Sequence, residues 1–177
     1  GILFALKAGV DSIEHSSLID DEGIRLAKDS GAFLSVNAYT PRYMLANADK
    51  MNILPESLEK ARSLAVRRLE NYRIAHEKGA NVVFGTDSGT YPHGDNARQF
   101  GIFVELGMTP MEAIQSATTV AAESLGWVGD TGAIAAGYFA DIVAVEGDPL
   151  DDITVLEDIA FVMKGGQVYK RPNPAAP

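Results

Sequence analysis

An α/β fold with parallel strands, followed by an antiparallel appendage, is predicted by the order of apolar segments along the chain. Over residues 1–130, short and nearly continuous apolar segments alternate with longer segments whose apolar residues recur at helical spacing. This alternation is typical of buried parallel strands joined by helices. From Gly132 onward, glycine-rich turns and short alternating strands replace it, which indicates antiparallel hairpins.

The first half of the chain carries end signals for its helices. Gly9 and Gly31 follow helical segments as C-caps, and acidic residues precede Lys28 in the second of them, as the helix dipole favours. The opening residues therefore correspond to the last turns of a helix, and we expect the natural protein to extend upstream. The predicted elements are a helix end over 1–9, a strand over 10–15, a helix over 16–30, a strand over 32–36 and a long loop through 37–41.

The second half begins with a long helix that starts at Pro55 and stops at Gly79, with apolar residues at helical spacing between them. The elements predicted after it are a strand over 81–84, helices over about 96–106 and 110–125, and short strands over 140–145, 159–164 and 167–169. The organisation expected from this pattern is 1–130 as the parallel part, 131–171 as the antiparallel part and 172–177 as a proline- and alanine-rich tail.

Composition excludes several classes of protein. The formal charge is −9, from 15 basic and 24 acidic residues, and the arginines of the long helix alternate with acids, so no nucleic-acid footprint is expected. No apolar run approaches the ~20 residues that span a bilayer. Cysteine is absent, which rules out disulfides and thiolate sites without choosing between the cytoplasm and an oxidising compartment. No signal peptide is visible, so any localisation signal would lie upstream.

Two polar residues mark the candidate site. In parallel α/β folds, functional groups collect at the carboxyl ends of strands, where the loops converge on one face. His15 ends the first predicted strand and Asp87 follows the third. Imidazole and carboxylate are suitable ligands for zinc or a similar divalent ion. Beside zinc the pKa of water falls to ~7, so a metal held here would generate a nucleophile at neutral pH, with Asp87 as proton acceptor.

The residues alone leave other interpretations open. His15 could be a hydrogen-bonded structural histidine, and Asp87 could be an ordinary turn or cap aspartate. His76 is expected on the surface of the long helix. His93 lies in the loop after Asp87, where it could contact substrate or simply be solvated. Gly85–Gly89 lacks the glycine spacing of a dinucleotide loop and the lysine of a P-loop, which argues against a nucleotide-binding domain.

Three separated blocks, in order, resemble the amidohydrolase superfamily, and within it the imidazolonepropionase-like and Xaa-Pro dipeptidase-like branch. The first is Gly9 to His15, and the second is Gly85-Thr86-Asp87-Ser88-Gly89 with Pro92-His93-Gly94. The third runs from Gly132 to Pro149, with Gly147-Asp148-Pro149 at its end, and a hairpin over 162–168 follows. The resemblance spans almost the whole chain.

This resemblance implies the C-terminal part of a (β/α)8 metallo-dependent hydrolase barrel, strands six to eight, plus strands of a small β-sandwich. It implies one or two divalent metals, usually zinc, and hydrolysis of an amide-type C–N bond in a dipeptide, cyclic amide or related small molecule. His15 matches the metal-ligand histidine after the sixth strand, and Asp87 matches the aspartate after the eighth, which contacts metal and transfers the proton. His93 and Asn96 fall where the family's eighth loop meets substrate, and Tyr39, with Tyr43 and Arg42, is a further candidate substrate contact.

The chain also departs from the family pattern. The His-x-His pair, the lysine or other fourth-strand ligand and the fifth-strand histidine have no counterpart, so they are expected upstream of Gly1. A catalytic zinc needs at least three protein ligands, and three strands cannot close a barrel. We therefore expect the missing N-terminal half as a partner, self-association through exposed edges and an inactive isolated chain. The alternative function is a degenerate or non-catalytic module that packs against another chain.

Overall fold

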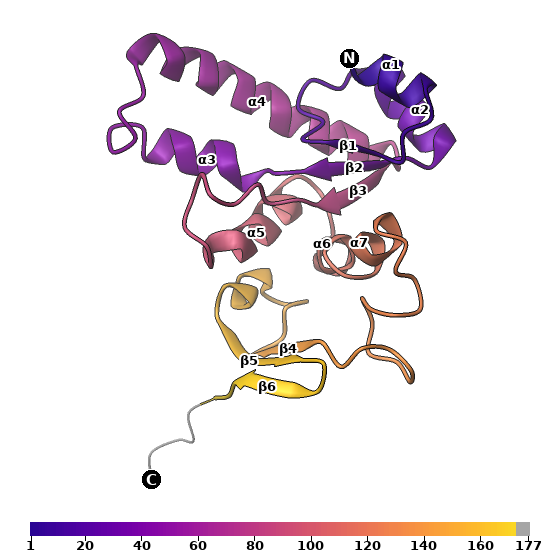
Figure 1. Cartoon of the computed structure of the whole chain (residues 1–177). Helices are drawn as coiled ribbons and strands as arrows, with labels where there is room; N and C mark the ends of the chain where they lie inside the picture. The colour runs from indigo at the N-terminus through magenta and orange to yellow at the C-terminus, as the bar shows by residue number, and fades with distance from the viewer. Residues whose placement is uncertain (173–177) are drawn as a thin grey trace.

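A three-stranded parallel sheet organises the N-terminal part of the structure, a computed structural model that describes residues 1–172 (Figure 1). Its strands are β1 (Ser12–Glu14), β2 (Phe33–Val36) and β3 (Asn81–Phe84). They lie in chain order β1-β2-β3 and both pairings are parallel, with Glu14 opposite Ser35 and Val36 opposite Phe84. Strands in this order, each followed by a returning helix, repeat the unit from which (β/α)8 barrels are built.

Helices cover one face of this sheet. Leu34, Val36 and Val82 point to that face and are buried in one core with side chains of α2, α4 and α5. Glu14 and Ser35 alternate with them and belong to the opposite, more exposed face. The helices are α1 (Ile2–Lys7), α2 (Asp21–Ser30), α3 (Tyr39–Ala46), α4 (Pro55–Glu77), α5 (Arg98–Glu105), α6 (Pro110–Ser116) and α7 (Thr119–Ser124). A 3-10 turn, η1 (Asp95–Ala97), precedes α5. None of the described helices is long and apolar enough to cross a membrane.

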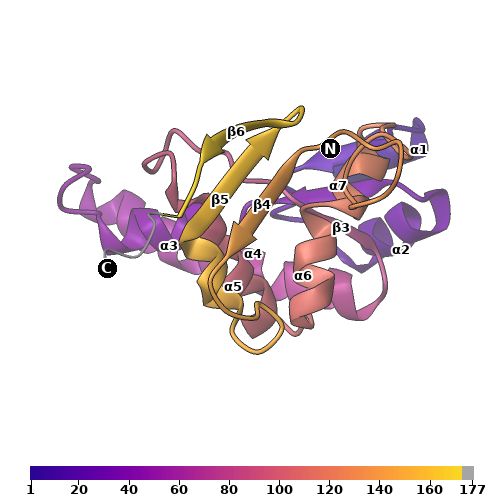
Figure 2. The same ribbon diagram turned by 90° about the horizontal axis from the view of Figure 1, so that it is seen from below.

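A second sheet of three antiparallel strands follows (Figure 2). It consists of β4 (Ile142–Val145), β5 (Ile159–Lys164) and β6 (Gln167–Lys170), in that order, with the 3-10 turn η2 (Ile153–Glu157) between β4 and β5. The β5–β6 turn uses Gly165 and Gly166, both with positive φ, and the Asp141 carboxylate accepts a hydrogen bond from the Gly165 N–H at 2.7 Å. Figure 2 shows this sheet beside α5 and α6.

The predicted alternation, the parallel sheet and the antiparallel hairpins are confirmed, whereas three local predictions are wrong. The segment expected as a long loop enters α3 at Tyr39, because Pro41 sits in the first turn, where a missing N–H costs no intrahelical bond. The helix expected over 16–30 begins only at Asp21, since Asp20 caps it by accepting from Gly23 N–H at 2.9 Å. The helix expected over 110–125 is divided into α6 and α7 at Thr118, whose backbone is not helical.

The second layer of the expected β-sandwich stays a prediction, because the described part of 131–171 forms one three-stranded layer. The tail expected over 172–177 lies outside the described residues from position 173 onward. The His76 ring, expected on the surface, is partly buried in α4 and lies 3.9 Å from the Glu112 carboxylate.

A buried amide side chain joins the carboxyl ends of β2 and β3. Gln99 is 0% exposed, and its Nε2 donates to the carbonyl of Val36 at 3.2 Å and to that of Gly85 at 2.6 Å. Its Oε1 accepts from the Tyr39 N–H at 3.2 Å. Without Gln99 the Gly85 carbonyl and the Tyr39 N–H would lose their partner, whereas the Val36 carbonyl also accepts from the Gly85 N–H at 2.9 Å. Each buried backbone group left without a partner costs free energy. Gln99 therefore fixes the two chain segments that follow β2 and β3.

We expect Gln99→Leu to lower the free energy of unfolding by about 2 kcal/mol, since it leaves the Tyr39 N–H and the Gly85 carbonyl without partners. Urea unfolding of the protein that carries this chain would measure the loss. Gln115→Leu is the matched control, because Gln115 is exposed on α6 and should change stability by no more than about 0.5 kcal/mol. Equal stability of the two variants would show that the Gln99 hydrogen bonds do not support the strand ends.

Candidate active site

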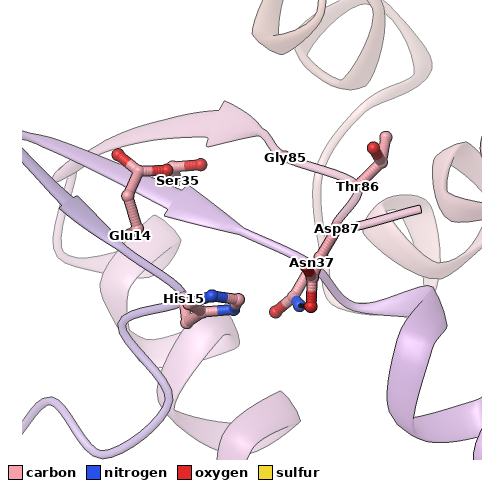
Figure 3. Close-up of a pocket in the computed structure, with 7 residues that line it drawn as sticks. All are labelled: Glu14, His15, Ser35, Asn37, Gly85, Thr86 and Asp87. Carbon is pink, nitrogen blue, oxygen red and sulfur yellow. Dashed lines mark hydrogen bonds between the residues drawn. The ribbon is translucent and has the colours of Figure 1, made fainter. Parts of the chain in front are cut away.

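A cavity of about 240 Å³ opens at the carboxyl edge of the parallel sheet (Figure 3). Each of the three strands contributes to it through its last residues or the loop that follows. The lining residues are Glu14, His15, Ser35, Asn37, Gly85, Thr86 and Asp87. The structure thus brings His15 and Asp87, 72 positions apart in the chain, to the same cavity. Figure 3 shows the His15 ring directed toward Asn37 and Asp87.

Both candidate ligands have an unusual backbone conformation. His15 has φ 64° and Asp87 has φ 51°, in the left-handed region that residues other than glycine rarely adopt. Such conformations persist only where the surrounding structure enforces them, and they concentrate at functional sites. At His15, the buried Tyr72 hydroxyl donates to the backbone carbonyl at 2.5 Å, and the next residue, Ser16, bonds through its Oγ to Ile13 O at 2.8 Å.

Asn37 is a lining residue that the sequence analysis did not single out as functional. Its side chain is 3% exposed, and Nδ2 donates to the Asp87 Oδ2 at 3.4 Å. Its Oδ1 lies 3.4 Å from the Tyr72 hydroxyl, which contacts His15 as well. Burial raises the pKa of Tyr72, so this hydroxyl is protonated at neutral pH and available as a donor. The signal that could have found Asn37 was its position directly after β2, at the same sheet edge as His15 and Asp87.

The three predicted substrate contacts lie outside the lining of this cavity. Tyr39 stacks edge-on against Tyr91 with ring centroids 4.8 Å apart, and its hydroxyl lies 3.5 Å from the Asp95 carboxylate. Burial, and then the charge of Asp95, raise the pKa of Tyr39. His93 Nδ1 lies 3.4 Å from the Ser88 hydroxyl. Asn96 Oδ1 is buried without a hydrogen-bond partner.

Arg42, another candidate contact, is engaged elsewhere. Its guanidinium forms a two-pronged ion pair with the Glu105 carboxylate, and this contact lowers the pKa of Glu105. An arginine held in this way has fewer free donors for a substrate carboxylate.

The donor set of the cavity fits a divalent metal in kind but not in number. His15 and Asp87 supply an imidazole and a carboxylate, the ligand types that zinc accepts. Within residues 1–172, no group of three or more histidine, cysteine, aspartate or glutamate side chains comes close enough to hold an ion. The described residues therefore offer two candidate ligands, whereas a catalytic zinc site requires three or more protein ligands.

Comparison with known proteins decides the family. Residues 2–169 match the amidohydrolase family. The chain belongs to the amidohydrolase family. It is 36% identical to ochratoxinase of Aspergillus niger over 179 aligned positions, which cover 98% of the chain and 36% of that protein. The predicted superfamily is thereby confirmed, and the solved structure of a Xaa-Pro dipeptidase described next confirms the Xaa-Pro dipeptidase-like branch.

Solved amidohydrolase structures agree with the fold. A Xaa-Pro dipeptidase with methionine bound in its active site superimposes with a TM-score of 0.89 at 38% identity, over 96% of the chain and 42% of that protein. The A. niger ochratoxinase structure superimposes with a TM-score of 0.83 at 35% identity, over 96% of the chain and 39% of that protein. The chain thus spans less than half the length of these relatives, and its parallel sheet fits a partial barrel.

Gly85 permits the close approach of β2 and β3 at this amidohydrolase cavity. A Cβ at this position would lie 2.5 Å from Ser35 Oγ and 3.2 Å from the Val36 carbonyl oxygen. The first contact could be relieved by a shift of a small side chain, but the second involves backbone. Only glycine therefore fits where β3 ends.

We expect Gly85→Ala to destabilise the protein by about 1–3 kcal/mol through this overpacking, and Ser35→Ala in the same chain to recover part of the loss. Thermal or urea unfolding measures both. The control is Gly101→Ala in α5, where an added Cβ meets no atom within 4 Å and helix propensity favours alanine by up to ~1 kcal/mol. A Gly85→Ala variant as stable as the Gly101→Ala variant would refute the close-approach constraint.

Proposed function

We propose that the protein containing this chain hydrolyses an amide-type C–N bond with the help of a bound divalent metal, and that this metal is zinc. The observation that carries the proposal is the meeting of His15 and Asp87 in one cavity at the carboxyl edge of the sheet, in a chain of the amidohydrolase family. In this proposal His15 and Asp87 hold one or two ions together with ligands from the rest of the protein. A bound zinc ion supplies a Lewis acid and lowers the pKa of water to ~7.

Asp87 is proposed as the residue that moves the proton. One carboxylate oxygen, Oδ2, faces the Asn37 amide, which leaves Oδ1 available to the attacking water. The water oxygen forms the new bond to the amide carbon while Asp87 accepts the water proton. As the C–N bond breaks, Asp87 returns the proton to the leaving nitrogen, so the carboxylate is regenerated at the end of the cycle.

The substrate class is proposed from the relatives. A relative described as a Xaa-Pro dipeptidase holds methionine in its active site, and another is ochratoxinase. A dipeptide, cyclic amide or related small molecule is therefore proposed. Tyr39, His93 and Asn96, in the segments that follow β2 and β3, remain proposed substrate contacts, since the cavity described here is only part of a larger pocket in this proposal.

The partner is proposed to be the rest of the polypeptide. Relatives that match the chain are more than twice its length. In this proposal residues 1–130 contribute the last three βα units of a closed barrel, residues 131–171 contribute to a β-sandwich, and the intact protein self-associates as a homo-oligomer.

We expect Asp87→Asn in the intact protein to lower kcat about 10²–10⁴-fold, because the amide cannot accept the proton of the attacking water. Steady-state kinetics on a panel of dipeptides and N-acyl amino acids would measure the loss, with circular dichroism to verify the fold. Asp141→Asn is a suitable control, since Asp141 lies in the turn region of the second sheet. If Asp87→Asn lost only stability and no rate, the alternative of a non-catalytic module would be favoured.

Metal removal gives a separate test. Dialysis of the intact protein against a chelator is expected to abolish hydrolysis and added zinc to restore it, while His15→Ala should reduce the bound zinc measured by atomic emission. His76→Ala is the matched histidine control, because His76 lies on α4 near Glu112 and should retain wild-type zinc content. Full activity after exhaustive metal removal would contradict the proposed function.

A further inference from the structure

The buried Tyr72 hydroxyl and the buried Asn37 amide connect the two candidate ligands, His15 and Asp87. Tyr72 comes from the C-terminal part of α4, the longer of the two helices between β2 and β3, and is 2% exposed. Its hydroxyl lies 2.5 Å from the His15 carbonyl oxygen and 3.4 Å from Asn37 Oδ1. Asn37 in turn donates from Nδ2 to Asp87 Oδ2 at 3.4 Å. One chain of contacts thus runs from the loop after β1 to the loop after β3.

The hydroxyl of Tyr72 and the amide of Asn37 are polar groups in a buried position. A core position behind a sheet is usually apolar, and a buried hydroxyl or amide lowers stability unless its hydrogen bonds are made. Both groups here are turned toward the two residues with left-handed backbones rather than toward a helix or strand of the core. The Asn37 amide also determines which oxygen of the Asp87 carboxylate remains free.

We propose that Asn37 and Tyr72 are positioning residues that hold His15 and Asp87 in the mutual orientation required for metal binding. The proposal rests on the proposed function and adds two residues that set its metal affinity. Tyr72 donates its one hydroxyl proton to the His15 carbonyl and contacts Asn37 Oδ1 at 3.4 Å, and Asn37 orients the Asp87 carboxylate. Hydrogen-bonded partners of metal ligands typically contribute 10–100-fold to metal affinity or activity.

The test uses the intact protein with two variants: Tyr72→Phe, which removes only the hydroxyl, and Asn37→Leu, which keeps the branch at Cγ but replaces the amide by bulkier methyl groups. Zinc affinity is measured by competition with a chromophoric chelator, and kcat/KM on the best dipeptide substrate. We expect Asn37→Leu to weaken zinc binding 10–100-fold and Tyr72→Phe about 10-fold. Because Tyr72 supports His15 directly and Asn37 supports Asp87, the double variant should bind zinc more weakly than either single variant.

The matched control is Asn71→Leu. Asn71 precedes Tyr72 on α4 and donates from Nδ2 to the Ser17 carbonyl at 3.0 Å, so it ties down the same loop after β1 through Ser17 and not through a hydrogen bond to His15, Asn37 or Asp87. We expect Asn71→Leu to lower the melting temperature while zinc affinity stays within about threefold of wild type. A merely structural role for Tyr72 and Asn37 would give all three variants the same profile.

The outcomes separate this inference from the proposed function. Wild-type protein that binds zinc and hydrolyses substrate, with folded Asn37→Leu and Tyr72→Phe variants of unchanged zinc affinity, would overturn the positioning role alone. Wild-type protein that binds no divalent metal would overturn the proposed function, and the positioning role with it.

Discussion

The hydrogen bonds that Gln99 and Tyr72 make at the carboxyl ends of the strands are the constraint on which the site depends. Three parallel strands bring their ends to one edge, but each chain segment then turns away and its backbone groups lose their ladder partners. Gln99 holds the segments after β2 and β3, and Tyr72 holds the segment after β1. Both side chains come from helices that pack on the covered face of the sheet. The geometry of the cavity therefore depends on how these helices pack in the core.

This arrangement explains why residues with strained backbones are stable here. His15 and Asp87 adopt left-handed conformations, which cost of order 1–3 kcal/mol each for residues other than glycine. The supporting hydrogen bonds and the close approach at Gly85 offset that cost. With these backbone conformations, the side chains of His15 and Asp87 line the cavity at the ends of the strands.

The two faces of the parallel sheet have different roles. The covered face is apolar and continuous with α2, α4 and α5, whereas the opposite face carries the exposed Glu14 and the half-buried Ser35. The chain covers 36% of ochratoxinase and 42% of a Xaa-Pro dipeptidase. A site with two candidate metal ligands, open on one side, is consistent with an amidohydrolase whose remaining ligands come from other strands, as we propose.

The sequence by itself determined the α/β class, the antiparallel part and the pairing of His15 with Asp87, because apolar periodicity, cap residues and strand-end positions are local properties of the chain. The family followed from the resemblance of three separated sequence blocks. It did not predict α3 or the break at Thr118, where proline placement and local hydrogen bonding override helical spacing. Asn37 had only its position after a strand as a signal, and Tyr72 and Gln99 had none, since a tyrosine or glutamine in a helix is ordinary. Only the tertiary structure decided their roles, because hydrogen bonds between segments 35 to 63 positions apart exist only once the helices pack against the sheet.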